Sequence, residues 1–259
     1  MAIAVCSTNW VMTTEGEDRA FILHRYPFSD SSLVLEVLTA SRGRLGLLAR
    51  GARRPRSALG GLEAGRPFLL RWRGHGELLT LVGADEASPA RLFDPWQGLC
   101  LFYVNELVLR LTARNDPAPE LFAAYTEVLE AFWSERRATW YLRRFEQRLL
   151  QSLGWAADLS HCAVCGSAWQ PGTDAWSQGP GTAPRCPRHA EPGAPVLPDA
   201  LIQWLRGHMA EAPPAAVREP LRRYLRAQID GLLDGRPLES RRLLAAYLQR
   251  QRDSGRPVW

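Results

Sequence analysis

Two short pairs of metal-binding residue types constrain this chain more than any other feature of its sequence. Cys162 and Cys165 are separated by two residues, Cys186 and His189 are also separated by two, and twenty residues lie between the pairs. Zinc prefers four ligands in a tetrahedron, and each turn of this spacing aims two ligands at one ion. The spacing therefore predicts one structural Zn²⁺ bound by Cys162, Cys165, Cys186 and His189. His161 is adjacent and could compete as a ligand, but His189 fits the pair spacing better.

The segment between the two pairs has little besides a metal that could order it. It is rich in turn-forming residues, namely Pro171, Gly172, Gly179, Pro180, Gly181 and Pro184. Zinc binding can contribute an apparent ~10–16 kcal/mol toward folding a segment of this kind. Four local ligands also close the coordination shell, whereas a catalytic zinc keeps one position open. We therefore expect a structural ion, with three reduced thiols in a loop as the alternative.

One class of zinc enzyme uses similar residues. Nucleobase deaminases combine a His-x-Glu motif with a later Pro-Cys-x-x-Cys motif. Here His189-Ala190-Glu191 follows the first cysteine pair, no proline precedes Cys162, and Cys186 supplies a fourth ligand. The chain contains no lysine, so it has no Gly-x-x-x-x-Gly-Lys phosphate loop, and its five histidines form no Ser/His/Asp set. We expect no enzymatic activity.

The five cysteines include two that stand alone, Cys6 and Cys100. This odd number with clustered ligands is typical of metal binding in a reducing compartment rather than of a disulfide framework. No apolar run approaches the ~18 residues of a membrane span, and residues 1–18 lack the basic start of a signal peptide. We expect a cytoplasmic protein in which residues 1–18 form an N-terminal arm or an extra strand, or result from an upstream start.

Short apolar runs recur at close spacing in the first third of the chain. They predict strands at 19–26, 33–39, 44–50, 66–72 and 78–83, separated by turns rich in Gly, Pro, Ser and Asp. Five short strands of this spacing fit a small closed barrel over residues 19–85. An OB-fold is the preferred interpretation, and an SH3-like barrel fits nearly as well.

The hydrophobic period changes to that of a helix after residue 90. Asp94 followed by Pro95 predicts a helix start. Apolar spacing predicts three helices between residues 95 and 154, and further helices at 199–211, 215–233 and 239–252. The predicted fold class is therefore α+β. An N-terminal OB-fold-like barrel precedes an α-helical domain, residues 90–259, that carries a zinc-binding insert at 160–191.

Positive charge is concentrated around the third predicted strand. Six of the sixteen residues from 42 to 57 are arginine and none is acidic. Residues 1–83 contain 11 arginines against 7 acidic residues, whereas residues 84–259 contain 21 against 20. Guanidinium groups pair bidentately with phosphate oxygens, and a clustered excess is what a nucleic-acid surface needs. A solvated basic loop is the alternative. The first candidates for DNA contact are Arg42, Arg44, Arg50, Arg53, Arg54 and Arg56, and the second are Arg71 and Arg73.

Aromatic residues are interleaved with these arginines. Tyr26 and Phe28 follow Arg25 closely, and Trp72 stands between Arg71 and Arg73. Proteins that bind single strands combine a basic groove with rings on which bases stack. In a strand, however, Trp72 faces away from its two neighbours. If those arginines face solvent, Trp72 belongs to the core.

Several motifs, taken in order, resemble the RecO family, the bacterial recombination mediators of the RecFOR pathway. The segments concerned are Phe28–Val34, Thr39, Gly43, Arg50–Ser57, Gly76–Leu78, Tyr103–Leu107, Phe145–Trp155, Leu159 with the cysteines after it, and Arg236–Arg241. Asp30 stands where the family usually has glutamate, and residues 1–18 have no counterpart. Since some family members lack a complete zinc site, a structural role for the metal is the one expected.

This resemblance implies a function in DNA repair. RecO proteins bind single- and double-stranded DNA, anneal strands coated with single-strand-binding protein, contact that protein's acidic C-terminal tail, and act with RecR to help load RecA. The implied location is the bacterial cytoplasm, with nucleoid association during repair. Two alternatives remain: a zinc-stabilised OB-fold module that binds RNA or single-stranded DNA without annealing, and a scaffold whose arginines meet an acidic protein tail.

Overall fold

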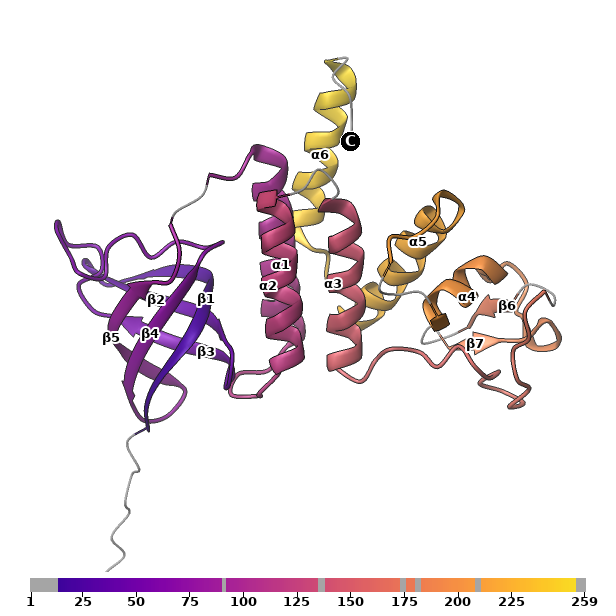
Figure 1. Cartoon of the computed structure of the whole chain (residues 1–259), viewed down its shortest axis with the longest axis horizontal. Helices are drawn as coiled ribbons and strands as arrows, with labels where there is room; N and C mark the ends of the chain where they lie inside the picture. Colours follow the sequence, from indigo (N-terminus) through magenta and orange to yellow (C-terminus); the bar gives the residue numbers. More distant parts are fainter. Residues whose placement is uncertain are drawn as a thin grey trace, which may run out of the picture. The chain divides into compact units, whose positions relative to one another are not determined.

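The chain forms two compact units, a β-barrel and a helical unit (Figure 1). The computed structural model describes residues 14–89, 92–134, 138–172, 176–179, 183–207 and 211–254. The described residues up to 89, together with 113–122, make up the barrel unit. The helical unit comprises residues 92–112 and the described residues from 123 onward. This arrangement confirms the predicted α+β class.

Five strands close the barrel in the order β1-β2-β3-β5-β4. They are β1 (Thr14–Phe28), β2 (Ser32–Thr39), β3 (Gly43–Ala49), β4 (Pro67–Gly74) and β5 (Leu78–Glu86). β3 lies parallel to β5, and the other neighbouring pairs are antiparallel. Because β3 pairs with β5 rather than with β4, the strands do not follow one another in sequence order. This Greek-key order agrees with the predicted OB-fold and leaves no open sheet edge.

The first strand begins earlier than the sequence predicts. Residues 14–18 continue β1 and pair with β4, from Thr14 opposite Gly74 to Asp18 opposite Leu70. The predicted barrel boundary at residue 19 therefore falls inside a strand. This extension contains no apolar run that would mark it, and what places it is its pairing with β4. The sequence predicts an arm or an extra strand at residues 1–18. Residues 1–13 of this segment lie outside the described residues.

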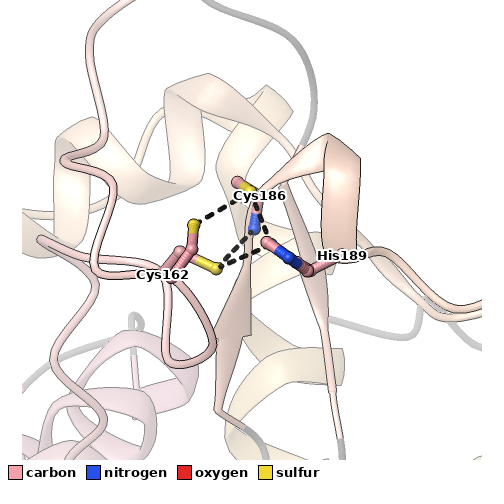
Figure 2. Close-up of side chains that lie close together, drawn as sticks. Cys162, Cys186 and His189 are labelled. Atoms are coloured by element: carbon pink, nitrogen blue, oxygen red, sulfur yellow. Dashed lines mark hydrogen bonds between the residues drawn. The ribbon is translucent and has the colours of Figure 1, made fainter.

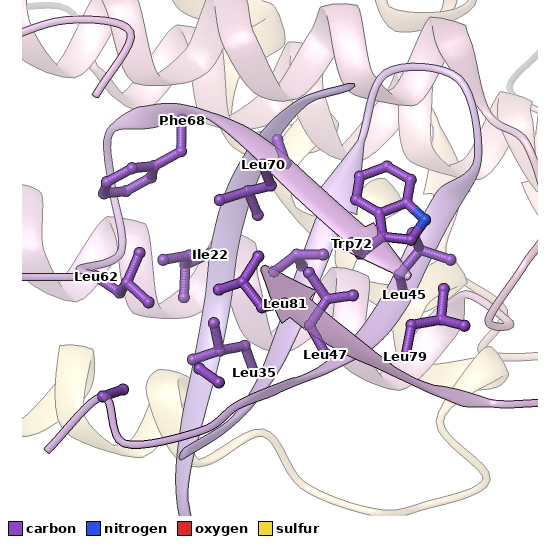
Figure 3. Packing of buried hydrophobic residues seen from close by; sticks show 14 residues of the cluster. Ile22, Leu35, Leu45, Leu47, Leu62, Phe68, Leu70, Trp72, Leu79 and Leu81 are labelled. Atoms are coloured by element: carbon purple, nitrogen blue, oxygen red, sulfur yellow. The ribbon is translucent and has the colours of Figure 1, made fainter. Parts of the chain in front are cut away.

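Alternating side chains of the five strands fill the barrel (Figure 3). Trp72 is only 2% exposed and packs in this core with Leu45, Leu70 and Leu79. Gly16 lies directly across the indole, since a Cβ there would stand 2.7 Å from a ring carbon. The interpretation of Trp72 as a core residue is confirmed, and its ring has no surface on which a base could stack.

Six helices form most of the second unit among the described residues. They are α1 (Pro95–Leu111), α2 (Pro119–Ser134), α3 (Ala138–Ser152), α4 (Asp199–Gly207), α5 (Ala215–Leu232) and α6 (Glu239–Asp253). Asp94 caps α1 as predicted: its carboxylate accepts from the Gln97 N–H at 2.8 Å, and the Gln97 side chain accepts from the Asp94 N–H at 2.9 Å. α4 is shorter than the predicted 199–211, because its described part ends at Gly207 and Glu211 lies outside a helix. No described helix combines the length and apolar content that crossing a bilayer requires.

A small sheet follows α3 and holds the cysteine-rich insert. It contains β6 (Trp176–Gln178), β7 (Pro184–Arg185) and β8 (Val196–Leu197) in the order β7-β6-β8. One 3₁₀ turn, η2 (Pro187–His189), comes directly after β7. The insert is therefore a separate small element within the helical unit.

Candidate metal centre and nucleic-acid interface

Two tight turns bring the four predicted metal ligands together. The first turn closes around Cys162, whose N–H bonds the Ser167 carbonyl and whose carbonyl accepts from the Gly166 N–H, each at 2.9 Å. Gly166 has a φ of +69°, a conformation that glycine adopts most readily. The second turn is η2, where the His189 N–H bonds the Cys186 carbonyl at 2.9 Å. Pairing of the Ala163 N–H with the Pro184 carbonyl in β7, also at 2.9 Å, holds the two turns side by side.

The four ligand atoms have the spacing of a tetrahedral site. The sulfur, or ring-nitrogen, atoms of Cys162, Cys165, Cys186 and His189 all lie within 4.8 Å of one another. Cys162 Sγ and Cys186 Sγ lie 3.8 Å and 3.3 Å from His189 Nδ1 (Figure 2). Cys165 Sγ lies 3.8 Å from Cys186 Sγ. Zinc–sulfur bonds of ~2.3 Å in a tetrahedron separate ligand atoms by ~3.8 Å. The cluster can therefore hold one metal ion, and its sulfur-rich donor set suits Zn²⁺.

The thiols of this cluster have altered proton affinities. Burial alone would raise the pKa of Cys162, but backbone N–H donors, that of Cys186 among them, outweigh it and lower the pKa to about 6. Burial raises the pKa of Cys186, and the neighbouring thiols of Cys162 and Cys165 raise it further. Deprotonation of Cys162 is thus favoured, whereas deprotonation of Cys186 beside it is disfavoured. A bound cation removes that opposition, because it stabilises every thiolate that binds it.

The other candidate ligands lie outside the cluster. His161 Nδ1 is 3.6 Å from the carboxylate of Asp158, and the cluster found among the described residues does not include it. Cys100 is fully buried in α1, where burial raises the pKa of its thiol to about 12. Cys6 lies outside the described residues. The preference for His189 over His161 therefore agrees with the geometry.

The arginine-rich stretch does not form one continuous patch. β3 runs through it, so Arg42 and Arg44 lie at the start of this strand, whereas Arg50 and the residues after it lie beyond its end. Arg50 follows Arg44 by six positions along the chain, a rise of ~20 Å in a strand. The predicted set is therefore divided between the two ends of the barrel.

Arg44 is largely engaged within the barrel. Its guanidinium lies 3.1 Å from the carboxylate of Glu36, a β2 residue whose side chain is 5% exposed. Arg114, from the segment between α1 and α2, pairs with the other oxygen of the same carboxylate. The Asn115 N–H also bonds the Arg44 carbonyl at 2.8 Å. This arrangement gives Arg44 a structural role in holding residues 113–118 on the barrel.

Arg71 is also engaged, although at the surface. Its guanidinium lies 2.6 Å from Asp85 and 3.4 Å from Glu17. Hydrogen bonding to Asp85 is the main reason why the pKa of Arg71 is raised. Gly83 makes room for this side chain, since a Cβ there would stand 2.6 Å from it. Arg73 is exposed and, among the described residues, forms no ion pair.

Four exposed arginines remain together beyond the end of β3. They are Arg50, Arg53, Arg54 and Arg56, which we call the arginine loop. No carboxylate in the described part of the chain pairs with any of them. Hydrogen bonds from the Arg53 N–H to the Ser31 carbonyl (2.9 Å) and from its guanidinium to the Ser29 carbonyl (3.3 Å) hold the loop against the β1–β2 turn. Of the predicted arginines, this group is the best placed to contact phosphates.

The helical unit contains a cavity lined by arginines and a tryptophan, which the sequence did not reveal. A cavity of about 660 Å³ lies at the start of α3 and α5. Its lining combines Trp140 and Pro213 with the guanidinium groups of Arg143, Arg218 and Arg222. Arg143 pairs with Glu146 and Arg222 with Glu219, whereas Arg218 donates to the Pro213 carbonyl at 3.2 Å. No local pattern marks this site, because Arg143 and Ala212, the nearest residues of its two halves, lie 69 positions apart in the chain.

Comparison with known proteins gives one consistent family. The model of the family described as "Recombination protein O N terminal" matches residues 12–89, and "Recombination protein O C terminal" matches residues 93–242. A DNA repair protein RecO of Acidithiobacillus ferrooxidans is 51% identical over 240 residues, which cover 92% of this chain and 94% of that protein. The RecO protein of an Azoarcus species is 38% identical over 237 residues, covering 90% and 96%. That of Actinobacillus succinogenes is 36% identical over 245 residues, covering 90% and 97%.

Proposed function

Because this chain belongs to the RecO family of DNA repair proteins, we propose that it binds DNA and anneals complementary strands coated with single-strand-binding protein. It then assists RecA loading together with RecR and catalyses no chemical step itself. The observation that most supports DNA annealing is the arginine loop, at one end of a closed barrel, with four exposed guanidinium groups that pair with no carboxylate in the described part of the chain. For RecR and RecA, the support is family membership alone.

Annealing requires that two polyanions approach each other. A positive surface lowers their repulsion, and it must do so without holding the base edges that are to pair. Arginine contacts to phosphates meet this requirement, because they bind any sequence and leave the Watson–Crick edges free. The arginine loop lies on the outside of the barrel unit, where such contacts can form.

The acidic tail of single-strand-binding protein requires a different kind of site. We propose that it binds the cavity lined by Trp140 and Arg218 in the helical unit. Apolar and aromatic lining with a few positioned charges is typical of peptide and small-ligand pockets. The guanidinium of Arg218, which pairs with no carboxylate among the described residues, complements an acidic peptide. Replacing Arg218 by glutamate should weaken binding of a labelled tail peptide in anisotropy titrations. Arg223→Glu, on the same helix but outside the lining, should leave binding unchanged.

The four-residue Cys/His cluster holds Zn²⁺ in this proposal. The metal joins two turns of a glycine- and proline-rich insert, and four protein ligands leave no position for a substrate. Its function is therefore to fold residues 160–191. Metal analysis of the purified protein should give one zinc per chain, and Cys186→Ser should reduce this content.

The direct test of the function is annealing of complementary DNA strands that have been precoated with single-strand-binding protein. The proposal predicts that the protein accelerates annealing and that RNA competes more weakly than DNA of the same length. Binding without acceleration would contradict the annealing proposal and would favour the simpler zinc-stabilised binding module.

A further inference from the structure

Two aromatic rings lie exposed on the barrel beside the arginine loop. Tyr26 and Phe28 are 47% and 50% exposed, whereas the other aromatic residues described in the five strands are at most 2% exposed. Residues two apart in a strand face the same side, so both rings face outward at the end of β1. Two neighbouring exposed rings offer apolar surface that a ligand can cover.

A β-bulge in β1 turns these two rings outward. Pairing with β2 shifts between Ile22, which lies opposite Val37, and His24, which lies opposite Glu36. Ile22 is in the barrel core before the bulge. Without the extra residue, Tyr26 would have the same inward orientation as Ile22. Bulges of this kind re-aim side chains next to functional sites.

The ring of Phe28 and the arginine loop share one concave surface. A cavity of about 370 Å³ is lined by Phe28, Leu48, Arg50 and Arg54, among others. This volume lies within the ~300–1,000 Å³ range of small-ligand sites. Ser32, opposite Phe28 across the strand pair, is too small to cover the ring, and its hydroxyl accepts from the loop at the Gly51 N–H (3.4 Å). The ring face and the two guanidinium groups are therefore held next to each other.

We propose that Tyr26 and Phe28 form a platform on which unpaired bases of single-stranded DNA stack, while Arg50 and Arg54 bind the phosphates of the same strand. This inference rests on the proposed DNA-binding function and adds the residues that contact bases. Stacking on the ring requires a free base face, which a duplex does not offer, whereas a guanidinium needs only a phosphate.

The two kinds of contact therefore respond differently when strands pair. The arginine contacts persist on duplex DNA, and the ring contacts are lost as the bases stack on one another. Affinity for DNA falls at this step, so the annealed product is released in preference to the single strands. The platform thus gives annealing a direction that a purely basic surface lacks.

The test compares three DNA ligands with the full-length protein. Wild type should bind an oligo-dT strand at least about fivefold more tightly than an abasic strand of equal length and charge. This ratio corresponds to ~1 kcal/mol, the lower limit for stacking of one base. Phe28→Ala and Tyr26→Ala should each reduce this difference, the double variant should remove it, and duplex affinity should stay unchanged in all three. Trp155→Ala, which removes a ring that is 59% exposed in the helical unit, is the matched control and should bind all three ligands as wild type does.

The wild-type comparison of oligo-dT with abasic DNA does not depend on the folding of any variant. Equal wild-type affinity for the two strands would overturn the platform while leaving the proposed DNA binding intact. Equal losses on single-stranded and duplex DNA in Phe28→Ala would also overturn it. Absence of wild-type binding to every DNA ligand would instead contradict the proposed function itself. Phe28→Leu, which keeps an apolar side chain without a ring, should behave like Phe28→Ala.

Discussion

The number of arginines that contact DNA can be read from the salt dependence of binding. The arginine loop offers four exposed guanidinium groups that have no carboxylate partner among the described residues. Each phosphate contact to a single strand contributes ~−0.7 to the slope of log affinity against log salt concentration. Four contacts therefore predict a slope of ~−2.8. Replacing Arg50 and Arg54 by alanine removes two contacts, so the slope should change to ~−1.4.

A matched control separates these contacts from a general loss of charge. Arg226→Ala/Arg242→Ala removes the same two charges from exposed arginines that are already paired, with Asp230 and Glu239. Its slope should stay at ~−2.8. Fluorescence anisotropy with an oligo-dT strand, repeated at several salt concentrations, measures all three proteins. Equal slopes for the loop variant and wild type would refute the assignment of the DNA surface to the arginine loop.

Three further predictions concern how the barrel and the insert are held together. Glu36→Gln removes the carboxylate that two partly buried guanidinium groups share. Urea titrations should show a free energy of unfolding that is lower by about 3 kcal/mol or more. The control Glu17→Gln, which affects a surface pair, should lower the free energy of unfolding by less than ~1 kcal/mol. Gly43→Ala should destabilise the barrel much more than Gly76→Ala. Both glycines have a positive φ, which costs an alanine ~1–2 kcal/mol at either position. Only at Gly43 would the added Cβ also meet a carbonyl oxygen, at 1.8 Å, whereas the space around Gly76 is open. Chelating the metal should raise the rate of hydrogen exchange in residues 160–191 and leave the affinity for oligo-dT within about twofold of the untreated protein. A large loss of affinity with unchanged exchange would contradict a purely structural role of the metal.

The sequence predicted most of the elements for physical reasons that act locally. The short apolar runs in 33–39 and 44–50 correspond closely to β2 and β3, and Asp94 with Pro95 marks the start of α1. The metal cluster was predictable because its ligands occur in two short turns whose spacing is set by coordination geometry. Strand alternation predicted a core position for Trp72 only if Arg71 and Arg73 face solvent, and the structure buries the indole.

Features that depend on distant parts of the chain could not be predicted in this way. The arginine-rich stretch looked continuous because nothing local shows that β3 would divide it between two ends of the barrel. Arg44 looked available because its partnership with Glu36 is completed by Arg114, seventy residues away in the chain. The bulge between Ile22 and His24 arises from the pairing with β2 and leaves no pattern within β1 itself. For the Arg44 ion pair, the sequence did contain one local indication, the single acidic residue Glu36 within an apolar strand.

The central claim is that the arginine loop brings complementary DNA strands together. Its most direct test is the annealing rate of strands precoated with single-strand-binding protein, measured with wild type, Arg53→Glu/Arg54→Glu and the control Arg226→Glu/Arg242→Glu, after the three proteins are shown to melt alike. The account predicts rapid annealing by wild type and the control, and annealing near the protein-free rate for the loop variant. Wild-type rates in the loop variant would contradict it.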